Sequence, residues 1–371
     1  MSIQIELIES WLVDIPTIRP HKLSMTTMGC QTLMLVKMTD RDGAEGWGEG
    51  TTIGGLSYGP ESPEGMKSAI DTYLAPAVCG RAFDGPAALA AAMNLPVKGN
   101  TFAKSALETA FLDLQGKRLG VPVSTLLGGA RSPTLPVLWT LASGDTQRDI
   151  EEGKRLLAEG RHSAFKLKIG AKSLAEDLRH TRAIREGLGE GVSIRVDVNQ
   201  AWDAVTAVRG MAALQEIGID LVEQPVALWD RATLVQLSQR FTLPVLADEA
   251  VADAHDGYAL AAAGFTGAYA LKIAKAGGPA QALKLAHVAQ AAGVALYGGT
   301  MLEGTIGTLA SLHAWSTLPL SWGTEMFGPL LLKDDIVANP LVFREGGVTI
   351  PQGPGLGITL DDDKFRHYQR K

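Results

Sequence analysis

Four short apolar runs lie between residues 193 and 273: SIRVDV (193–198), DLVE (220–223), VLAD (245–248) and AYALKI (268–273). Each run carries a charged residue near its end, and each spacer between runs is long enough for one helix and its loops. Strands that alternate with helices in this way form a parallel sheet. Such strands are covered on both faces, so they read as apolar runs.

Four further runs continue the pattern on both sides: residues 135–141, 165–169, 294–297 and 320–324. Eight strand–helix units within roughly 200 residues predict an α/β fold with a (β/α)8-type barrel. The alternative is an open doubly wound sheet, which usually carries a glycine-rich phosphate-binding turn after its first strand. The sequence has no such turn after a strand, and this favours the barrel.

The first 130 residues show strands followed by helices, as in an α+β domain. An Asp-Gly turn between two alternating runs predicts a hairpin, and the opening segment would add a third antiparallel strand. The expected strands are residues 3–13, 31–38 and 44–50, and the expected helices run from Ser62 to about Val78 and from about Asn100 to about Gly120. We predict an N-terminal α+β capping domain (1–130), the barrel (131–330) and a C-terminal segment (331–371) that returns to the cap.

The composition excludes several classes of protein. The chain has 371 residues, 46% hydrophobic and 20% charged, which is typical of a globular protein. Its net charge of −6 argues against a nucleic-acid partner. Two cysteines and no recognisable signal peptide predict a cytoplasmic protein. Residues 285–324 contain one charge, Glu303, but their polar residues and Pro319 favour a buried core over a membrane span.

Charged side chains lie at the carboxyl ends of the expected strands. They are Lys166, Lys168, Asp197, Glu223, Asp248, Lys272 and Glu325. From Asp197 to Lys272 the steps are 26, 25 and 24 residues, about one strand–helix unit each. The charges therefore share one height at the barrel edge that carries the active site in this fold. One such charge is usually structural, but charges on five consecutive strands favour an active site.

Three of these residues suggest a metal site. Asp197, Glu223 and Asp248 offer only oxygen ligands, which suit a hard dication such as Mg²⁺ or Mn²⁺ and argue against zinc. The neighbouring Glu249 would face away if its strand continues, so a supporting or a purely structural role stays open. Lys166 and Lys168 share one strand face, and nearby positive charge makes a lysine usable as a base. A metal beside a lysine suggests proton transfer at a carbon next to a carboxylate.

Five motifs lie at the ends of the expected strands: KLK (166–168), DVN (197–199), EQP (223–225), ADE (247–249) and LKIAK (271–275). With these motifs the chain resembles the muconate-lactonizing subgroup of the enolase superfamily. Further matching stretches are residues 16–23, 51–59, 98–105, 139–145, 297–304 and 322–332. The resemblance covers essentially the whole chain and extends beyond the general superfamily pattern.

The resemblance implies a role for each matching residue. Asp197, Glu223 and Asp248 match the metal ligands, with Mn²⁺ or Mg²⁺ as cofactor. Lys168 matches the catalytic lysine, and Lys166 matches its neighbour, which helps to bind the carboxylate. Lys272 matches a lysine on the opposite face, and Glu325 matches a glutamate assigned as acid, which could equally orient the substrate. The implied substrate-binding residues are Ile53, Tyr58, Asn199 and Thr300, with Thr17, His21 and Met28 as further candidates in the specificity loops 16–30 and 51–60.

The implied reaction is the metal-dependent cycloisomerisation of cis,cis-muconate to muconolactone in catechol breakdown. One carboxylate closes a lactone across a double bond, the other becomes an enediolate, and Lys168 protonates the α-carbon. Lysines on both faces leave syn and anti addition open. The resemblance also implies a homo-oligomer, commonly an octamer, that acts on a small dicarboxylate without a nucleic-acid or membrane partner.

Three alternatives remain at this stage. A chloromuconate cycloisomerase would share the same catalytic set. An epimerase or racemase of dipeptides or N-acylamino acids would also use paired lysines, but the dipeptide epimerases usually carry D-x-D where this chain has Thr324-Glu325-Met326. A silent barrel acting as a binding module would show damage to the metal–lysine set, and this set is intact.

Overall fold

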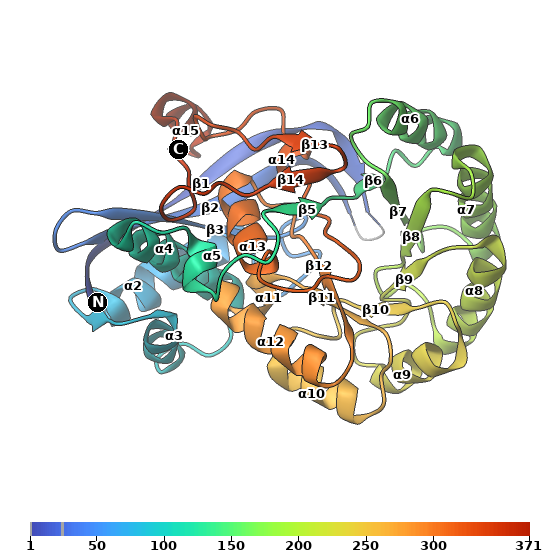
Figure 1. Ribbon diagram of the computed structural model, residues 1–371, viewed down its shortest axis with the longest axis horizontal. Coiled ribbons are helices and arrows are strands. Elements are labelled where there is room, and N and C mark those ends of the chain that lie inside the picture. The colour runs from blue at the N-terminus through green and yellow to red at the C-terminus, as the bar shows by residue number, and fades with distance from the viewer. Residues whose placement is uncertain (1, 24–25) are drawn as a thin grey trace.

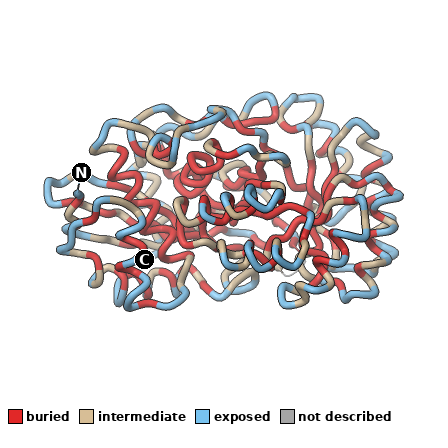
Figure 2. The backbone as a smooth tube through the Cα atoms, turned by 60° about the horizontal axis from the view of Figure 1, so that its bottom comes forward, coloured by how far each residue is buried: buried red, intermediate tan, exposed pale blue. Residues whose placement is uncertain are grey.

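The structure, a computed structural model, describes residues 2–23 and 26–371. Figure 1 shows an antiparallel sheet with its helices packed against one side of a helix-wrapped parallel barrel. Buried residues concentrate along the middle of the molecule, where the two parts meet, and exposed residues mark the outer loops (Figure 2). No helix in the described part of the chain is long and apolar enough to cross a membrane.

The N-terminal sheet contains the expected hairpin and third strand. Its strands are β1 (Ile3–Lys22), β2 (Thr27–Asp40), β3 (Glu45–Thr51) and β4 (Ala82–Phe83), in the order β3-β2-β1-β4. Strand β1 extends well past residue 13, because its pairing with β2 resumes at His21 after a register shift that begins at Pro16. This extension was not predicted from the sequence because residues 16 and 20 are prolines, and proline is disfavoured within a strand.

Both helices expected in the N-terminal part are present. The first runs as α1 (Pro63–Ala69), a π-helical turn (Ile70–Leu74) and α2 (Ala75–Val78), and Ser62 caps its start by accepting a hydrogen bond from the Gly65 amide. Helix α3 (Pro86–Asn94) follows, and α4 (Thr101–Leu119) ends at Gly120, whose φ of 70° needs a glycine. Helix α4 packs across β3 at very short range, since a Cβ at Gly48 would lie 1.9 Å from the Ala106 carbonyl oxygen.

The barrel is confirmed as a parallel sheet of seven strands in chain order. Its strands are β6 (Trp139–Leu141), β7 (Ala164–Lys168), β8 (Ser193–Asp197), β9 (Leu221–Glu223), β10 (Val245–Ala247), β11 (Ala268–Leu271) and β12 (Ala295–Gly298). The surrounding helices are α6 (Thr146–Ala158), α7 (Leu174–Leu188), α8 (Ala204–Ile217), α9 (Arg231–Arg240), α10 (Ala254–Ala262), α12 (Pro279–Ala291) and α13 (Thr305–Trp315), with short helices α5 (Val123–Leu126) and α11 (Ile273–Ala276).

Two of the expected strands differ from the prediction. The run 135–141 is split into β5 (Thr134–Pro136) and β6, and β5 pairs with β14 (Gly347–Thr349) outside the barrel. The run 320–324 is not a strand, and only Thr324 forms bridges, to Val137 on one side and Gly298 on the other. Gly323, at a φ of 64°, leaves the extended conformation, so a single residue closes the ring where an eighth strand was expected.

The C-terminal segment contains α14 (Gly328–Leu331), β13 (Phe343–Arg344), β14 (Gly347–Thr349) and α15 (Asp362–Tyr368). Helix α15 lies against the N-terminal sheet, where the Phe365 ring centroid is 5.4 Å from that of Trp11 and 5.9 Å from that of Trp47. Arg370 pairs with Asp14 of β1. The segment therefore contacts the cap, while the domain boundaries at 130 and 330 stay predictions.

The close packing of β3 on α4 predicts that Gly48→Ala destabilises the fold by about 2 to 4 kcal/mol, because the added methyl group overlaps helix backbone that cannot move aside. Gly29→Ala in β2 is the matched control, since a Cβ there meets nothing within 4 Å, and it should change stability by less than about 0.5 kcal/mol. Thermal unfolding followed by circular dichroism measures both. Equal midpoints for the two variants would contradict the packing described here.

Candidate active site

The charged residues at the strand ends come together at the carboxyl-terminal mouth of the barrel. In the sheet register, Lys168 lies beside Asp197, and Asp197 lies beside Glu223. Asp197, Glu223 and Asp248 are at most 2% exposed, although each follows or ends a different strand. Buried charges of this kind need partners of opposite sign, and lysines supply them.

Lys166 is enclosed between two carboxylates. Its Nζ lies 2.5 Å from Glu223 Oε2 and also donates to Glu325 Oε2, and the Tyr297 ring covers it at 5.0 Å. Burial alone would lower the pKa of Lys166, but the charges of Glu223 and Glu325 outweigh burial and hold that pKa well above its usual value. Lys166 is therefore a fixed cation.

Lys168 has a more open environment. Its Nζ donates to Asp197 Oδ2 at 2.5 Å, and Asn199 Oδ1 lies 3.4 Å away. The side chain retains 14% exposure, against 1% for Lys166, and it lines a cavity. Of these two lysines, Lys168 is the one whose ammonium group can meet a bound molecule.

Asp248 binds two lysines and a tyrosine. Lys272 Nζ and Lys275 Nζ each lie 2.7 Å from one of its oxygens, and Tyr58 Oη donates to it at 3.0 Å. Burial would raise the pKa of Asp248, but the two lysines hold it well below the usual range. Lys275 had no expected role, although it belongs to the LKIAK motif. Helix α11 turns it back toward Asp248, and a motif of that length does not reveal such a turn.

Glu249 also reaches the site. Strand β10 ends at Ala247, so Glu249 is not held on the opposite face, and Asn199 Nδ2 lies 3.4 Å from its Oε1. Burial, followed by the charges of Asp248 and Asp197, raises the pKa of Glu249 to about 7. Of the two roles left open for Glu249, this contact favours a supporting role at the site.

A cavity of about 20 Å³ lies at the centre of this cluster. All four residues expected to bind substrate line it, together with the catalytic candidates Lys168, Lys272 and Glu325. Lys166 and Asp248 are not part of its lining. The lining also includes His21, which sequence analysis named as a further candidate, and Thr140, Leu302 and Phe327, which it did not assign. Thr17 and Met28 are buried but not part of the lining, and residues 24 and 25 of the expected specificity loop lie outside the described residues.

The N-terminal sheet holds one wall of the cavity in place. Glu49 of β3 accepts hydrogen bonds from the amides of Gly304 and Gly307 at 2.7 and 2.8 Å. Gln31 of β2 donates to the carbonyl oxygens of Met301 and Leu302. These bonds position the loop between β12 and α13, which carries Thr300, so the cap is part of the site's construction.

The donor set fits a divalent cation in its chemistry. Within residues 2–23 and 26–371, no three His, Cys, Asp or Glu side chains converge closely enough to enclose a metal ion, because lysines pair with Asp197, Glu223 and Asp248. These three are buried oxygen donors on neighbouring strands. Burial and the nearby charge of Asp197 raise the pKa of Glu223 well above its usual value, which shows how crowded the negative charges are. A hard dication would relieve this crowding.

Two family models together match most of the chain. Residues 148–364 match the family described as enolase C-terminal domain-like, and residues 7–128 match the mandelate racemase / muconate lactonizing enzyme N-terminal domain. Muconate cycloisomerase 1 of Pseudomonas putida is 54% identical, with both chains covered fully. A chloromuconate cycloisomerase of Delftia acidovorans is 42% identical over 99% of each chain.

Solved structures agree with these matches. The muconate lactonizing enzyme from Klebsiella pneumoniae superposes with a TM-score of 0.94 and 64% identity, over 99% of this chain and 100% of that one. The Pseudomonas fluorescens enzyme complexed with muconolactone superposes with a TM-score of 0.98 and 51% identity, over the same shares.

The contacts of Tyr58 predict that Tyr58→Phe lowers the stability of the metal-free protein by about 1 to 2 kcal/mol, because the variant loses hydrogen bonds to buried charges on Asp248 and Lys272. Tyr73→Phe is the control, since Tyr73 is 61% exposed. Urea unfolding measures both variants. A Tyr58→Phe midpoint equal to that of the control would show that the phenol contributes nothing at this site.

Proposed function

The chain belongs to the mandelate racemase and muconate lactonizing enzyme family, and we propose that it converts cis,cis-muconate to muconolactone by intramolecular cycloisomerisation. It is an isomerase of the enolase superfamily that acts in catechol breakdown. The full-length similarity to muconate cycloisomerases carries this conclusion. The chloromuconate enzymes are more distant, which favours the unchlorinated substrate.

We infer that Lys168 moves the proton. One carboxylate oxygen of muconate forms a bond to a carbon of the diene, and the displaced electron pair moves toward the other carboxylate. The Lys168 ammonium then gives its proton to the carbon next to that carboxylate, and in reverse Lys168 removes this proton. Each turnover takes up one proton, because the muconate dianion becomes a lactone that keeps a single carboxylate, and water returns this proton to Lys168. The exposure of Lys168 to the cavity supports this assignment.

The other residues bind and orient the substrate in this proposal. Lys166 contributes a fixed positive charge near the substrate carboxylate, and Lys272 faces the cavity from another strand. Glu325 is assigned as an acid or as an orienting group, and its bond to Lys166 supports orientation. Ile53, Tyr58, Asn199 and Thr300 complete the walls of the pocket.

We propose that Asp197, Glu223 and Asp248 hold a divalent metal ion, Mn²⁺ or Mg²⁺. When bound, the cation supplies positive charge that stabilises the negative charge developing on the substrate. Lys166, Lys168, Lys272 and Lys275 pair with these carboxylates and hold them in place. The homo-oligomeric state and the cytoplasmic location stay predictions.

The proton-transfer role predicts that Lys168→Ala lowers kcat by about 100- to 10,000-fold, because the substrate α-carbon loses its proton donor. The loss of the conjugated-diene absorbance of cis,cis-muconate measures turnover. Lys154→Ala, at an exposed position of α6, is the control and should retain wild-type activity. A Lys168→Ala enzyme as active as this control would contradict the role, and a folded, metal-loaded wild type without turnover would contradict muconate as the substrate.

The metal proposal predicts that chelation abolishes turnover and that adding Mn²⁺ or Mg²⁺ restores it. The same ions should raise the thermal unfolding midpoint of the apoprotein by mass action, and Asp248→Asn should reduce that rise. Asp253→Asn, in the half-exposed cap of α10, is the matched control. Full activity after thorough chelation would show that the carboxylates serve only to pair with the lysines.

A further inference from the structure

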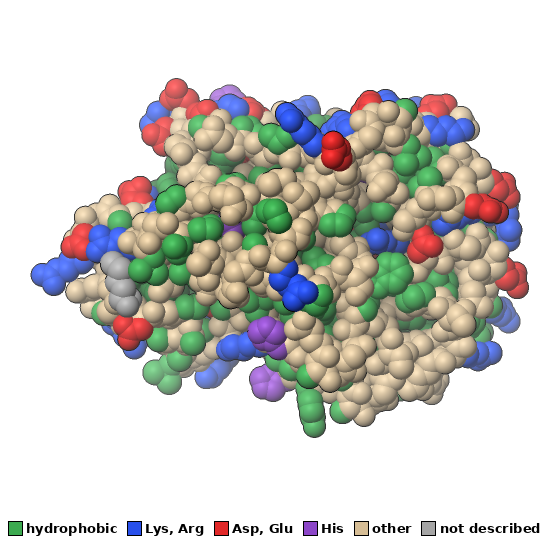
Figure 3. Space-filling view, in the orientation of Figure 1, with side chains coloured by type: hydrophobic (Ala, Val, Ile, Leu, Met, Phe, Trp, Pro, Cys, Tyr) green, Lys and Arg blue, Asp and Glu red, His purple; other side chains and the backbone are tan. Residues whose placement is uncertain are grey.

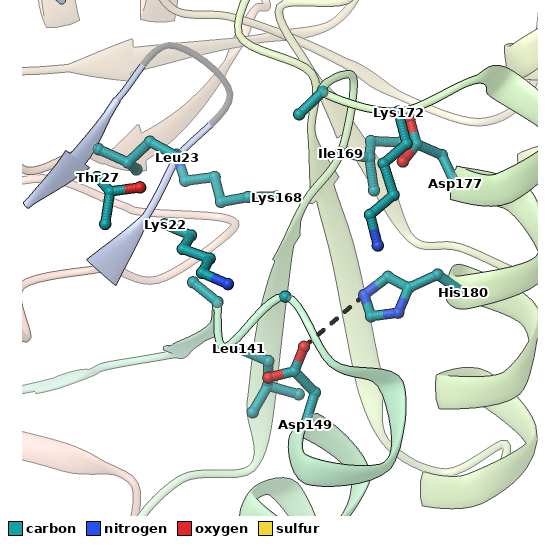
Figure 4. A pocket seen from close by; sticks show the side chains of 13 residues that line it. Lys22, Leu23, Thr27, Leu141, Asp149, Lys168, Ile169, Lys172, Asp177 and His180 are labelled. Atoms are coloured by element: carbon teal, nitrogen blue, oxygen red, sulfur yellow. Dashed lines mark ion pairs between the residues drawn. The ribbon is translucent and has the colours of Figure 1, made fainter. Parts of the chain in front are cut away.

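A second cavity, of about 200 Å³, adjoins the active site. It lies between Lys22, Leu23 and Thr27, at the neighbouring ends of β1 and β2, and the loops that follow β6 and β7 (Figure 4). Leu23 and Lys168 line both cavities, so the two are neighbours at the residue proposed to move the proton. The remaining residues around this second cavity have no part in the catalytic set.

Two lysines reach into the second cavity from opposite sides. Lys22 extends from the end of β1, and Lys172 extends from the loop after β7 (Figure 4). Both residues are exposed, and neither forms an ion pair within the described ranges, whereas Lys168 pairs with Asp197. Their ammonium groups are therefore available to an anion that enters from solvent.

The acidic residues around this cavity are engaged in its walls. Asp149 and Asp177 are 1% and 4% exposed, and each accepts a backbone hydrogen bond, from Ser143 at 3.0 Å and from Gly170 at 2.7 Å. His180 Nε2 lies 3.8 Å from Asp149, and burial lowers the pKa of His180, which disfavours a positive charge on the ring. The charges in this cavity that are most accessible to solvent are therefore those of the two lysines.

A dianionic substrate needs such a feature. The net charge of −6 repels it at long range, and Figure 3 shows basic and acidic side chains mixed mainly along the outline of the visible face, without a broad positive surface. Local charge at the entrance of a cleft can still raise the association rate, because nearby low-dielectric walls focus its field.

We propose that this cavity is an entrance vestibule for a small dicarboxylate, in which Lys22 and Lys172 bind the leading carboxylate before it reaches Lys168. The substrate class rests on the proposed function. The vestibule acts on arrival, so its lysines contribute to the association rate and leave the chemical step unchanged.

The test uses adipate, a saturated six-carbon dicarboxylate that cannot cyclise, with the metal-loaded enzyme. Stopped-flow tryptophan fluorescence follows its association, since the ring centroid of Trp139 lies 5.1 Å from that of Phe327, which lines the active-site cavity. Lys22→Gln/Lys172→Gln should lower the association rate constant roughly 5- to 20-fold in dilute buffer. The difference should shrink to within about twofold at roughly 0.3 M NaCl, where screening is strong.

The control is Lys98→Gln/Lys284→Gln, which also removes two positive charges, but at exposed positions outside the vestibule. Its association rate constant for adipate should equal that of wild type at every salt concentration. An equal fall of the association rate constant in both double variants would mean that only net charge matters, and it would overturn the vestibule. Wild-type association rates for Lys22→Gln/Lys172→Gln would overturn it too. So would the absence of adipate binding to the wild type.

The muconate reaction gives a second readout. In the vestibule variant, kcat/KM should fall with the association rate while kcat stays within about twofold of wild type, as expected when only arrival is slowed. A fall in kcat alone would place the two lysines in the chemical step and overturn the proposal. Absence of muconate turnover by wild type would refute the proposed function. The association rates of adipate would still test the vestibule proposal independently.

Discussion

Buried charges at the mouth of the barrel must all be balanced, and this requirement organises the rest of the site. Lys166 lies between Glu223 and Glu325, and Asp248 lies between Lys272 and Lys275. An unpaired charge at such a depth costs several kcal/mol, so removing one member exposes the others to that cost. The set therefore behaves as one unit, and its internal balance leaves Lys168 as the partly exposed lysine at the cavity.

The cap and the barrel form this site together. Tyr58 brings a phenol from the cap to Asp248, and Glu49 and Gln31 hold the loop that carries Thr300. The buried Glu49 accepts amide hydrogen bonds from a helix of the barrel, so the cap stabilises the helix start that follows this loop. The cap residues proposed to bind substrate are therefore connected through the protein interior to the strands that carry the charged residues.

Much of this arrangement could be predicted from the sequence, because apolar runs mark buried strands and the even spacing of Asp197, Glu223 and Asp248 places them in register. The closure of the barrel could not be predicted, because residues 320–324 have the pattern of a strand but only Thr324 among them forms bridges, one on either side. Lys275 was missed because its contact depends on a short helical turn. Thr140, Leu302 and Phe327 were missed because uncharged residues in a pocket wall resemble ordinary core residues.

The proposed reaction depends on proton transfer by Lys168 at the carbon next to the substrate carboxylate. The most direct test is turnover of muconate in D₂O, with deuterium in the muconolactone located by NMR, followed by α-hydrogen exchange of the product by wild type and by Lys168→Ala. We expect one deuterium, on one face of the α-carbon, and loss of the exchange in the variant. Deuterium on both faces in equal amounts, or exchange at the wild-type rate in Lys168→Ala, would contradict it.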